Sequence, residues 1–368
     1  MRVLHVAALV SEDGAYGGPV SVATDQVRAL RSAGHQVTLI AGWDGRASGD
    51  GDPATLLFRA RRPRPDTFAG MVAPGLLGWV LRHVRQFDVV HVHLTRDLVT
   101  LPAAWWAARL GVPLVVQTHG QVRAERGRAQ ALLDRVWTRR VVQRAAFLAL
   151  TRHEVADLER QGVPADRITR VVNGVPSAGR LAAPATSDPL VLFVSRLANR
   201  KRPVAFVEAA ALVHAVRPGV RFELWGPDGG EAGAVDAAIE AGGIGAVCTR
   251  RGPTSPAAAR DLLAGGQVFV LPSVAEPFPM AVLEALSAGL PVVLTTETGL
   301  SAAVAETGAG AVTDGSPREL ADAVLHLLAH EAWAAAAGRA VELARTRYSM
   351  DAVVATLESV YGGRGVSG

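Results

Sequence analysis

The sequence has almost no cysteine and no long uninterrupted apolar run, and each absence excludes a class of protein. Cys248 is the only cysteine in 368 residues, so no disulfide can form within the chain, which fits a reducing cytosol. The most apolar stretch, around residues 101–116, is broken by Arg109 and Gly111, so we expect no membrane-spanning helix. The apolar run over residues 1–10 is too short for a signal peptide and fits a buried strand. These features predict a cytoplasmic protein.

Lysine is also nearly absent. It occurs once, at Lys201, and arginine supplies the other basic side chains. The formal net charge is only +4 and no recognised nucleic-acid motif occurs, so we expect no nucleic acid among the partners. Hydrophobic residues make up 49% of the chain, which excludes a disordered protein, and the length is sufficient for two domains with separate cores.

Short apolar runs typical of buried strands alternate with helical segments in both halves of the chain. In the first half, the patterns predict strands at 3–10, 36–41, 56–59, 88–93, 113–117 and 147–150 and a helix at 20–33. In the second half, they predict strands at 190–195, 221–225, 247–251, 268–271 and 291–295 and helices at 203–216, 319–345 and 350–361. Such alternation indicates parallel sheets. We therefore expect an α/β protein with two Rossmann-like domains facing across a deep cleft, with ligands at the carboxyl ends of the strands.

The segment 276–284 is the most informative about function, because it places two carboxylates around the start of a helix. Pro279 suits the first helical position, where no backbone N–H is needed, and the helix should run from Met280 to about residue 288. Glu276 then lies on the loop before the helix, and Glu284 lies about one turn inside it. Helix N-termini attract phosphates. The segment therefore suits a sugar joined through a diphosphate to a ribose.

Basic side chains follow the first strand of the second half. Arg196 and Lys201 stand where a strand delivers side chains to the ligand-binding edge of a sheet. A departing diphosphate needs positive charge, which arginine supplies as a fork and lysine as a point charge. A solvated loop with surface bases remains the alternative.

The first half offers fewer candidates. Gly17 and Gly18 lie in a loop over residues 11–19 and can bring backbone amides close to a phosphate or sugar, although an ordinary flexible loop fits equally. His119 follows a predicted strand and could touch a substrate, with a buried structural histidine as the alternative. His91 and His93 alternate with valine on a predicted strand, and we expect one of them to face the core and His93 to approach the cleft. No spacing of His, Cys and Asp suggests a zinc site.

Seven arginines occur between Arg123 and Arg144. This segment could contact an anionic membrane surface or an acidic acceptor, which would make the protein peripheral on the inner face of the plasma membrane. A solvated basic helix is the other interpretation.

Taken together, these motifs resemble those of the retaining family-4 glycosyltransferases of the GT-B fold (glycosyltransferase group 1), over nearly the whole chain. The motifs that carry the resemblance are Thr118-His119-Gly120, Thr151 with Glu154, Asn173-Gly174-Val175, Ser195-Arg196-Leu197 with Lys201, Leu271-Pro272-Ser273, Glu276-Pro277-Phe278, Leu283-Glu284-Ala285 and Gly289-Leu290-Pro291-Val292-Val293. The chain departs from the family pattern at Pro279, where many members have glycine, and at the loop 225–228, where a Gly-x-Gly is commoner. Position 279 is therefore not counted as a contact.

The resemblance implies two domains with different ligands. An acceptor-binding domain would span residues 1–174, with the C-terminal helix at about 349–368 packing back onto it. A donor-binding domain would span residues 175–348. The resemblance also implies that Arg196 and Lys201 neutralise the donor diphosphate, while Glu276 and His119 contact the donor sugar; these four are the predicted catalytic residues.

The remaining donor contacts follow from the same resemblance. Glu284 would hold the ribose hydroxyls, Arg251 would lie near the base, and Gly17 and Gly18 would lie against the diphosphate and the acceptor. The predicted donor-binding residues are Gly17, Gly18, Arg196, Lys201, Arg251, Glu276, Phe278, Met280, Ala281 and Glu284.

The predicted activity is transfer of a sugar, with retention of configuration, from a UDP- or GDP-sugar to a hydroxyl of a sugar, glycolipid or small-molecule acceptor. The resemblance implies no metal and no cofactor. Assembly of cell-envelope or extracellular polysaccharide is the first role considered, and glycosylation of a small metabolite or sugar precursor is the second. A sugar-nucleotide epimerase on the same fold and a non-catalytic sugar-binding protein remain open. A nicotinamide oxidoreductase would need a Gly-x-Gly-x-x-Gly turn with a downstream acidic residue, which neither half contains.

Overall fold

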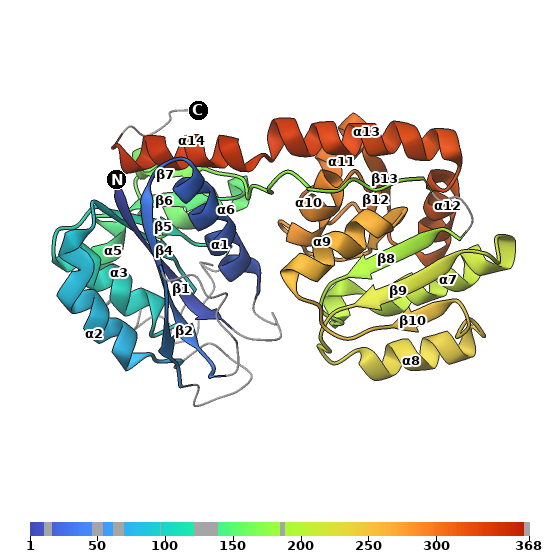
Figure 1. The fold of residues 1–368 in the computed structure, drawn as a ribbon, viewed down its shortest axis with the longest axis horizontal. Helices are drawn as coiled ribbons and strands as arrows, with labels where there is room; N and C mark the ends of the chain where they lie inside the picture. Colours follow the sequence, from blue (N-terminus) through green and yellow to red (C-terminus); the bar gives the residue numbers. More distant parts are fainter. Residues whose placement is uncertain are drawn as a thin grey trace. The chain divides into compact units, whose positions relative to one another are not determined.

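The computed structural model describes residues 1–10, 17–45, 54–61, 70–95, 97–120, 139–184 and 188–363. Among these residues the chain forms two compact units (Figure 1). Unit 1 holds the described residues up to Gly174 and from Met350 onward, and unit 2 holds Val175–Ser349. None of the described helices combines the length and the apolar character that a membrane span needs.

Unit 1 is built on a seven-stranded sheet in the order β3-β2-β1-β4-β5-β6-β7, in which all neighbours run parallel. Its strands are β1 (Arg2–Val10), β2 (Gln36–Trp43), β3 (Thr55–Arg59), β4 (Val89–His93), β5 (Leu114–Gln117), β6 (Ala146–Ala149) and β7 (Ile168–Arg170). Its described helices are α1 (Gly17–Ser32), α2 (Pro74–His83), η1 (Val84–Gln86), α3 (Thr100–Arg109), α5 (Arg139–Val142), α6 (Arg152–Arg160), η3 (Ala165–Arg167) and α14 (Met350–Tyr361).

Helices cover both faces of the unit 1 sheet, as near-continuous apolar strands require. One core joins the sheet to α2, α3 and α5 and contains Leu76, Ala104 and Val141. The other joins it to α1 and α14 and contains Val27 and Leu357. Figure 1 shows α14 lying beside α1, so the last helix of the chain packs against the first.

Unit 2 has a six-stranded parallel sheet in the order β10-β9-β8-β11-β12-β13. Its strands are β8 (Leu190–Val194), β9 (Arg221–Trp225), β10 (Cys248–Arg250), β11 (Val268–Leu271), β12 (Val292–Thr295) and β13 (Gly310–Thr313). Its helices are η4 (Asn199–Lys201), α7 (Pro203–Val216), α8 (Ala232–Ala241), α9 (Pro256–Gly265), α10 (Met280–Ser287), α11 (Ser301–Thr307), α12 (Pro317–Leu327) and α13 (His330–Arg347). Both sheets have the doubly wound strand order, in which the order reverses beside the first strand and leaves a ligand crevice at the carboxyl edge.

Three predicted helix positions are wrong. Helix α1 begins at Gly17 rather than near residue 20, so the two glycines form its first turn. The predicted helix 319–345 is two helices, because Ala329 has extended backbone (φ −72°, ψ 132°) between α12 and α13. Pro279 precedes helix α10 as its N-cap with ψ 112°, instead of occupying the first helical position.

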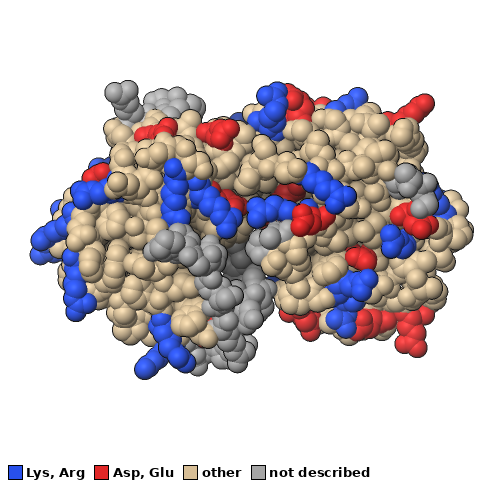
Figure 2. Space-filling model, in the orientation of Figure 1, with Lys and Arg blue, Asp and Glu red and all other residues tan. Residues whose placement is uncertain are grey.

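Figure 2 shows acidic and basic side chains interspersed on the face in view, with no continuous basic stripe among the described residues of that face. Such a stripe is the usual footprint of nucleic-acid binding. Residues 123–138 of the predicted basic segment lie outside the described residues, and α5 starts at Arg139.

Candidate active site

A largely buried ion pair lies beside the loop between β11 and α10 in unit 2. Glu276 Oε2 accepts a hydrogen bond from Lys201 Nζ at 2.5 Å and another from Arg200 Nη1 at 2.7 Å. The side chains of Glu276 and Lys201 are 9% and 11% exposed, whereas that of Arg200 is 53% exposed. Burial lowers the pKa of Lys201, and the attraction of Glu276 opposes this shift. Because water screens the buried pair weakly, its charges act strongly on any group placed next to them.

The backbone around Glu276 is tied to two neighbouring loops. Val274 N donates to Arg200 O at 2.9 Å, which joins this loop to η4. Gly299 N donates to Glu276 O at 2.9 Å, and a Cβ added at Gly299 would lie 1.9 Å from Pro277 O. Position 299 therefore has room only for glycine while Glu276 stays where it is.

Backbone donors gather at the N-terminal end of α10. Pro279 O accepts from Val282 N at 3.2 Å, so the ladder of the helix starts there. Among the described residues, no group accepts from the backbone amides of Phe278, Met280 and Ala281. Amides at a helix N-terminus attract anions, so this end of α10 can hold a phosphate or a sugar hydroxyl.

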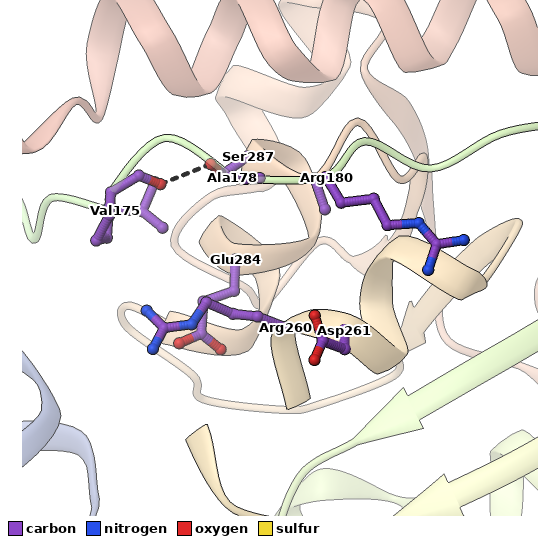
Figure 3. Close-up of a pocket in the computed structure, with 10 residues that line it drawn as sticks. Val175, Ala178, Arg180, Arg260, Asp261, Glu284 and Ser287 are labelled. Atoms are coloured by element: carbon purple, nitrogen blue, oxygen red, sulfur yellow. Dashed lines mark hydrogen bonds between the residues drawn. The ribbon is translucent and has the colours of Figure 1, made fainter. Parts of the chain in front are cut away.

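Glu284 lies one turn further along α10 and lines a cavity of about 440 Å³. Arg260 and Asp261 of α9 and Arg180 of the segment before β8 also line it, as Figure 3 shows. Ser287 Oγ donates to Pro176 O at 2.8 Å and closes one side. The cavity thus combines carboxylates, which accept from hydroxyls, with guanidinium groups, which bind oxyanions.

Arg196 and Arg251 both lie at the carboxyl edge of the unit 2 sheet. Arg196 follows β8 and packs on Gly229, where an added Cβ would lie 2.9 Å from the Arg196 Cγ and Cδ atoms. Arg251 follows β10, pairs with Glu223 at 3.0 Å and lies 5.9 Å from the Trp225 ring centre. These arginines therefore border the same sheet edge as Lys201.

In unit 1, His119 stands at the end of β5 in a backbone conformation unusual for histidine, with φ at +49°. The buried carboxylate of Glu154 on α6 holds this turn. Glu154 Oε1 accepts from Thr118 Oγ1 and from Gly120 N, the latter at 2.7 Å, and Oε2 accepts from Leu150 N at 2.7 Å. Glu154 lies 34 residues from Gly120 in the sequence. Its contacts with Thr118 and Gly120 nevertheless fix the position of His119 between them.

His91 faces the core, as expected for one of the two strand histidines, and His93, which we expected near the cleft, is fully buried as well. Residues two apart on a strand share a face, and these two rings stack with centroids 4.5 Å apart. His93 Nδ1 lies 3.0 Å from His119 Nε2, so the predicted site histidine rests on a buried one. Burial lowers the pKa of His119 to about 3, which keeps its imidazole neutral at physiological pH.

Comparison with known proteins identifies the family. A family model described as "Glycosyltransferase Family 4" matches residues 16–178, and one described as "Glycosyl transferases group 1" matches residues 188–330. The chain belongs to glycosyltransferase family 4. This glycosyltransferase is 30% identical over 306 residues to D-inositol 3-phosphate glycosyltransferase of Thermobispora bispora, a match that covers 75% of this chain and 70% of that one.

A second relative extends this result. The D-inositol 3-phosphate glycosyltransferase of Paenarthrobacter aurescens is 30% identical over 65% of this chain, and the matched part spans 64% of that relative's length. Solved structures confirm the GT-B fold predicted from sequence. HepE of Anabaena in complex with UDP and glucose has a TM-score of 0.74 at 19% identity, covering 99% of this chain and all of that one. Sucrose-phosphate synthase from Thermosynechococcus elongatus has a TM-score of 0.73 at 20% identity, covering 98% of both chains.

The glycosyltransferase brings some predicted site residues into contact and leaves others apart. Lys201 and Glu276 hydrogen-bond each other, and the amides of Met280 and Ala281 open the helix that carries Glu284. Gly17 and Gly18 form the first turn of α1, so their amides belong to a helix N-terminus rather than to a loop.

Sequence reasoning left three side chains out of the site. Arg200 pairs with Glu276, Arg260 shares the cavity of Glu284, and Glu154 holds the His119 turn. Arg200 could have been found from its place between Arg196 and Lys201. The contacts of Arg260 depend on tertiary packing, for which a single sequence carries no local signal. Glu154 was noted with Thr151 as part of the family resemblance, but its contact with the His119 turn also depends on tertiary packing.

Replacing Gly299 with alanine should lower kcat/KM by about 10²-fold, because Cβ would overlap Pro277 O and displace Glu276 by about 1 Å. Steady-state kinetics would measure the loss. Gly338→Ala is the matched control, since Gly338 lies inside α13 and an added Cβ meets nothing within 4 Å. Equal activity of the two variants would contradict the role of the Gly299 contact.

Proposed function

We propose that this glycosyltransferase moves a sugar from a nucleoside diphosphate sugar to an acceptor hydroxyl with retention of anomeric configuration. The observation that carries the proposal is the buried Lys201–Glu276 pair beside the N-terminal amides of α10, which have no acceptor among the described residues. Fixed cationic and N–H groups at one sheet edge suit a diphosphate whose charge grows as the glycosidic bond breaks.

The residues of unit 2 bind different parts of the donor. Lys201 and Arg196 neutralise the departing phosphate, and the amides of Met280 and Ala281 contact the phosphate and sugar. Glu276 accepts hydrogen bonds from the sugar hydroxyls while it orients Lys201. Since these cations meet the charge of the leaving group, we propose no requirement for a metal.

Neighbouring residues bind the ribose and the base of the donor. Glu284 accepts from the ribose hydroxyls inside its cavity, and Arg260 reaches the same space. Arg251, held by Glu223 next to the Trp225 ring, borders the base. We assign His119 to the transferred sugar and the amides of Gly17 and Gly18 to the diphosphate and acceptor.

Retention follows if the acceptor attacks the face from which the phosphate leaves. The transition state would resemble an oxocarbenium ion, and the departing phosphate oxygen would take the proton of the acceptor hydroxyl. The bond from the anomeric carbon to phosphate breaks while the bond to the acceptor oxygen forms, so no enzyme nucleophile is needed.

The acceptor is best sought among small polar molecules. The curated relatives bear the name D-inositol 3-phosphate glycosyltransferase, which favours a small phosphorylated polyol as the acceptor class for this chain. A lipid-linked saccharide of the cell envelope is the second candidate, and a membrane-bound acceptor would then use the basic segment that starts at Arg123. Assays with soluble and vesicle-bound acceptors would separate the two.

UDP or GDP should raise the thermal unfolding temperature, whereas NAD should not. A ligand present at 100 times its Kd stabilises the folded state by about 2.7 kcal/mol. Thermal shift with each nucleotide tests this directly. Stabilisation by NAD but not by UDP or GDP would exclude the proposed donor class. Product formed from a sugar nucleotide without any acceptor would instead favour an epimerase.

A further inference from the structure

Behind His119, five buried or half-buried side chains of unit 1 are joined by consecutive hydrogen bonds. His119 Nε2 lies 3.0 Å from His93 Nδ1, and His93 Nε2 lies 3.0 Å from His5 Nδ1. His5 Nε2 lies 3.2 Å from the Tyr361 hydroxyl, which lies 2.7 Å from His91 Nδ1. We call this chain of side chains the histidine relay; in order, its members are His119, His93, His5, Tyr361 and His91.

Strand register builds the relay. His5 of β1 pairs directly with His91 of β4, and His93 lies two residues further on the same face. Helix α14 packs against that face and brings the Tyr361 hydroxyl between His5 and His91. The relay therefore runs from the carboxyl edge of the sheet into its interior.

Every imidazole in the relay is neutral at physiological pH. Burial lowers the pKa of His5, His91 and His93 well below the usual value, and the neighbouring imidazoles lower it further. A neutral imidazole carries one proton, so one ring nitrogen donates and the other accepts. Each hydrogen bond of the relay also holds a single proton.

These two conditions leave only two arrangements of the protons. If His119 is protonated on Nε2, it donates to His93, which must then donate from Nε2 to His5, and so on inward. If His119 is protonated on Nδ1, every donor points outward instead. In both arrangements, all four histidines carry their proton on the same kind of nitrogen.

The relay does not conduct protons out of the site. Its inner end, His91 Nε2, is buried and has no hydrogen-bond partner among the described residues. A proton that entered at His119 would have no acceptor beyond His91. The relay can only hold one tautomer along its length.

At the outer end, no described residue hydrogen-bonds His119 Nδ1. We propose that the histidine relay locks its four imidazoles into one common tautomer and so decides whether this nitrogen donates to or accepts from the transferred sugar. His93, His5, Tyr361 and His91 are then positioning residues that act through His119. The link to the sugar rests on the proposed function, but the common tautomer does not.

A competing use of the same side chains is metal binding. Ligand nitrogens of His5, His91 and His93 lie within 4.8 Å of one another. Two of these rings, however, share a proton across the 3.0 Å contact of His5 Nδ1 with His93 Nε2, and a metal ion would have to displace it. The hydrogen bonds therefore favour the proton-sharing relay.

Two-bond ¹H–¹⁵N correlation spectra of the full chain, labelled with ¹⁵N-histidine, test the relay without substrate. The expected result is one tautomer for all four relay histidines, either all Nδ1–H or all Nε2–H. A mixture of tautomers among the four would overturn the proposal. A failed transferase assay would leave this result untouched, so the two proposals fail separately.

The variant His91→Phe tests which of the two tautomers the relay adopts when its inner end is changed. Without His91, the Tyr361 hydroxyl proton has one remaining acceptor in the relay, His5 Nε2, so His5, His93 and His119 should all become Nδ1–H. Any other pattern in the folded variant would overturn the relay. If this variant does not fold, the wild-type spectrum still decides. His83→Phe is the control, because His83 contacts Trp79 O instead and should leave the relay signals unchanged.

A titration with zinc chloride, followed by the same spectra, is the last part of the test. One equivalent of Zn²⁺ should leave the relay signals in place. Stoichiometric loss of the signals of His5, His91 and His93 would show a metal site and overturn the relay.

Discussion

Replacing Lys201 with alanine should lower kcat by about 10²–10³-fold, because the variant loses a fixed charge that strengthens as the phosphate departs. The loss has a second component. The Glu276 side chain is 9% exposed and, among the described residues, would keep only the more exposed Arg200 as a partner, so its carboxylate would turn toward a new one. Arg196→Ala should cost a similar factor through the diphosphate alone.

Arg200→Ala supplies the graded comparison. Its side chain is 53% exposed, and exposed ion pairs contribute little, so we expect less than about a tenfold loss. Steady-state kinetics with a UDP-sugar, together with calorimetric binding of UDP, separates catalysis from donor binding. Near-wild-type turnover of both the Lys201 and Arg196 variants would end the assignment of these residues to the leaving group.

Replacing Glu154 with glutamine should destabilise the protein by about 2–3 kcal/mol and lower kcat by about 10²-fold. Both carboxylate oxygens accept hydrogen bonds, from Thr118 and Gly120 on one side and from Leu150 on the other. A glutamine NH₂ must face a donor on one of these sides. The loss of one accepting oxygen leaves a buried N–H or O–H without a hydrogen-bond acceptor. It also releases the turn that holds His119.

Glu159→Gln is the matched control, because Glu159 lies on the exposed face of the same helix. Urea denaturation gives the change in unfolding free energy, and steady-state kinetics gives the change in kcat. If the Glu154 variant lost stability but kept full activity, the His119 turn would be structural only.

The element pattern was readable from sequence where local chemistry marks it. Helix α7 was predicted with its observed bounds, since Pro203 starts it and the apolar run sustains it. The start of α1 was missed because glycine at positions 17 and 18 favours a loop, whereas packing of the helix against β1 and β2 overrides that preference. The break at Ala329 has no glycine or proline to announce it.

The candidate site was readable in part for similar reasons. Short spacings separate three of the site residues from the end of a predicted strand or the start of a predicted helix. The sequence therefore predicted a position near the sheet edge for Glu276, Glu284 and Lys201. The histidine relay was missed although period two puts His91 and His93 on one face, because pairing with His5 and cover by Tyr361 join segments up to 356 residues apart. Long-range pairing of this kind leaves no trace in local composition.

The single lysine of this sequence is also a built-in reporter. Reductive methylation with ¹³C-formaldehyde modifies ε-amines and the α-amine only, so the labelled chain would show one dimethyl-lysine resonance, at Lys201. Its side chain is 11% exposed, and its amine is hydrogen-bonded to Glu276. The chemical shift of that resonance would report nucleotide binding to the unmutated chain. It would do so at the side chain expected to contact the phosphate whose bond to the sugar breaks.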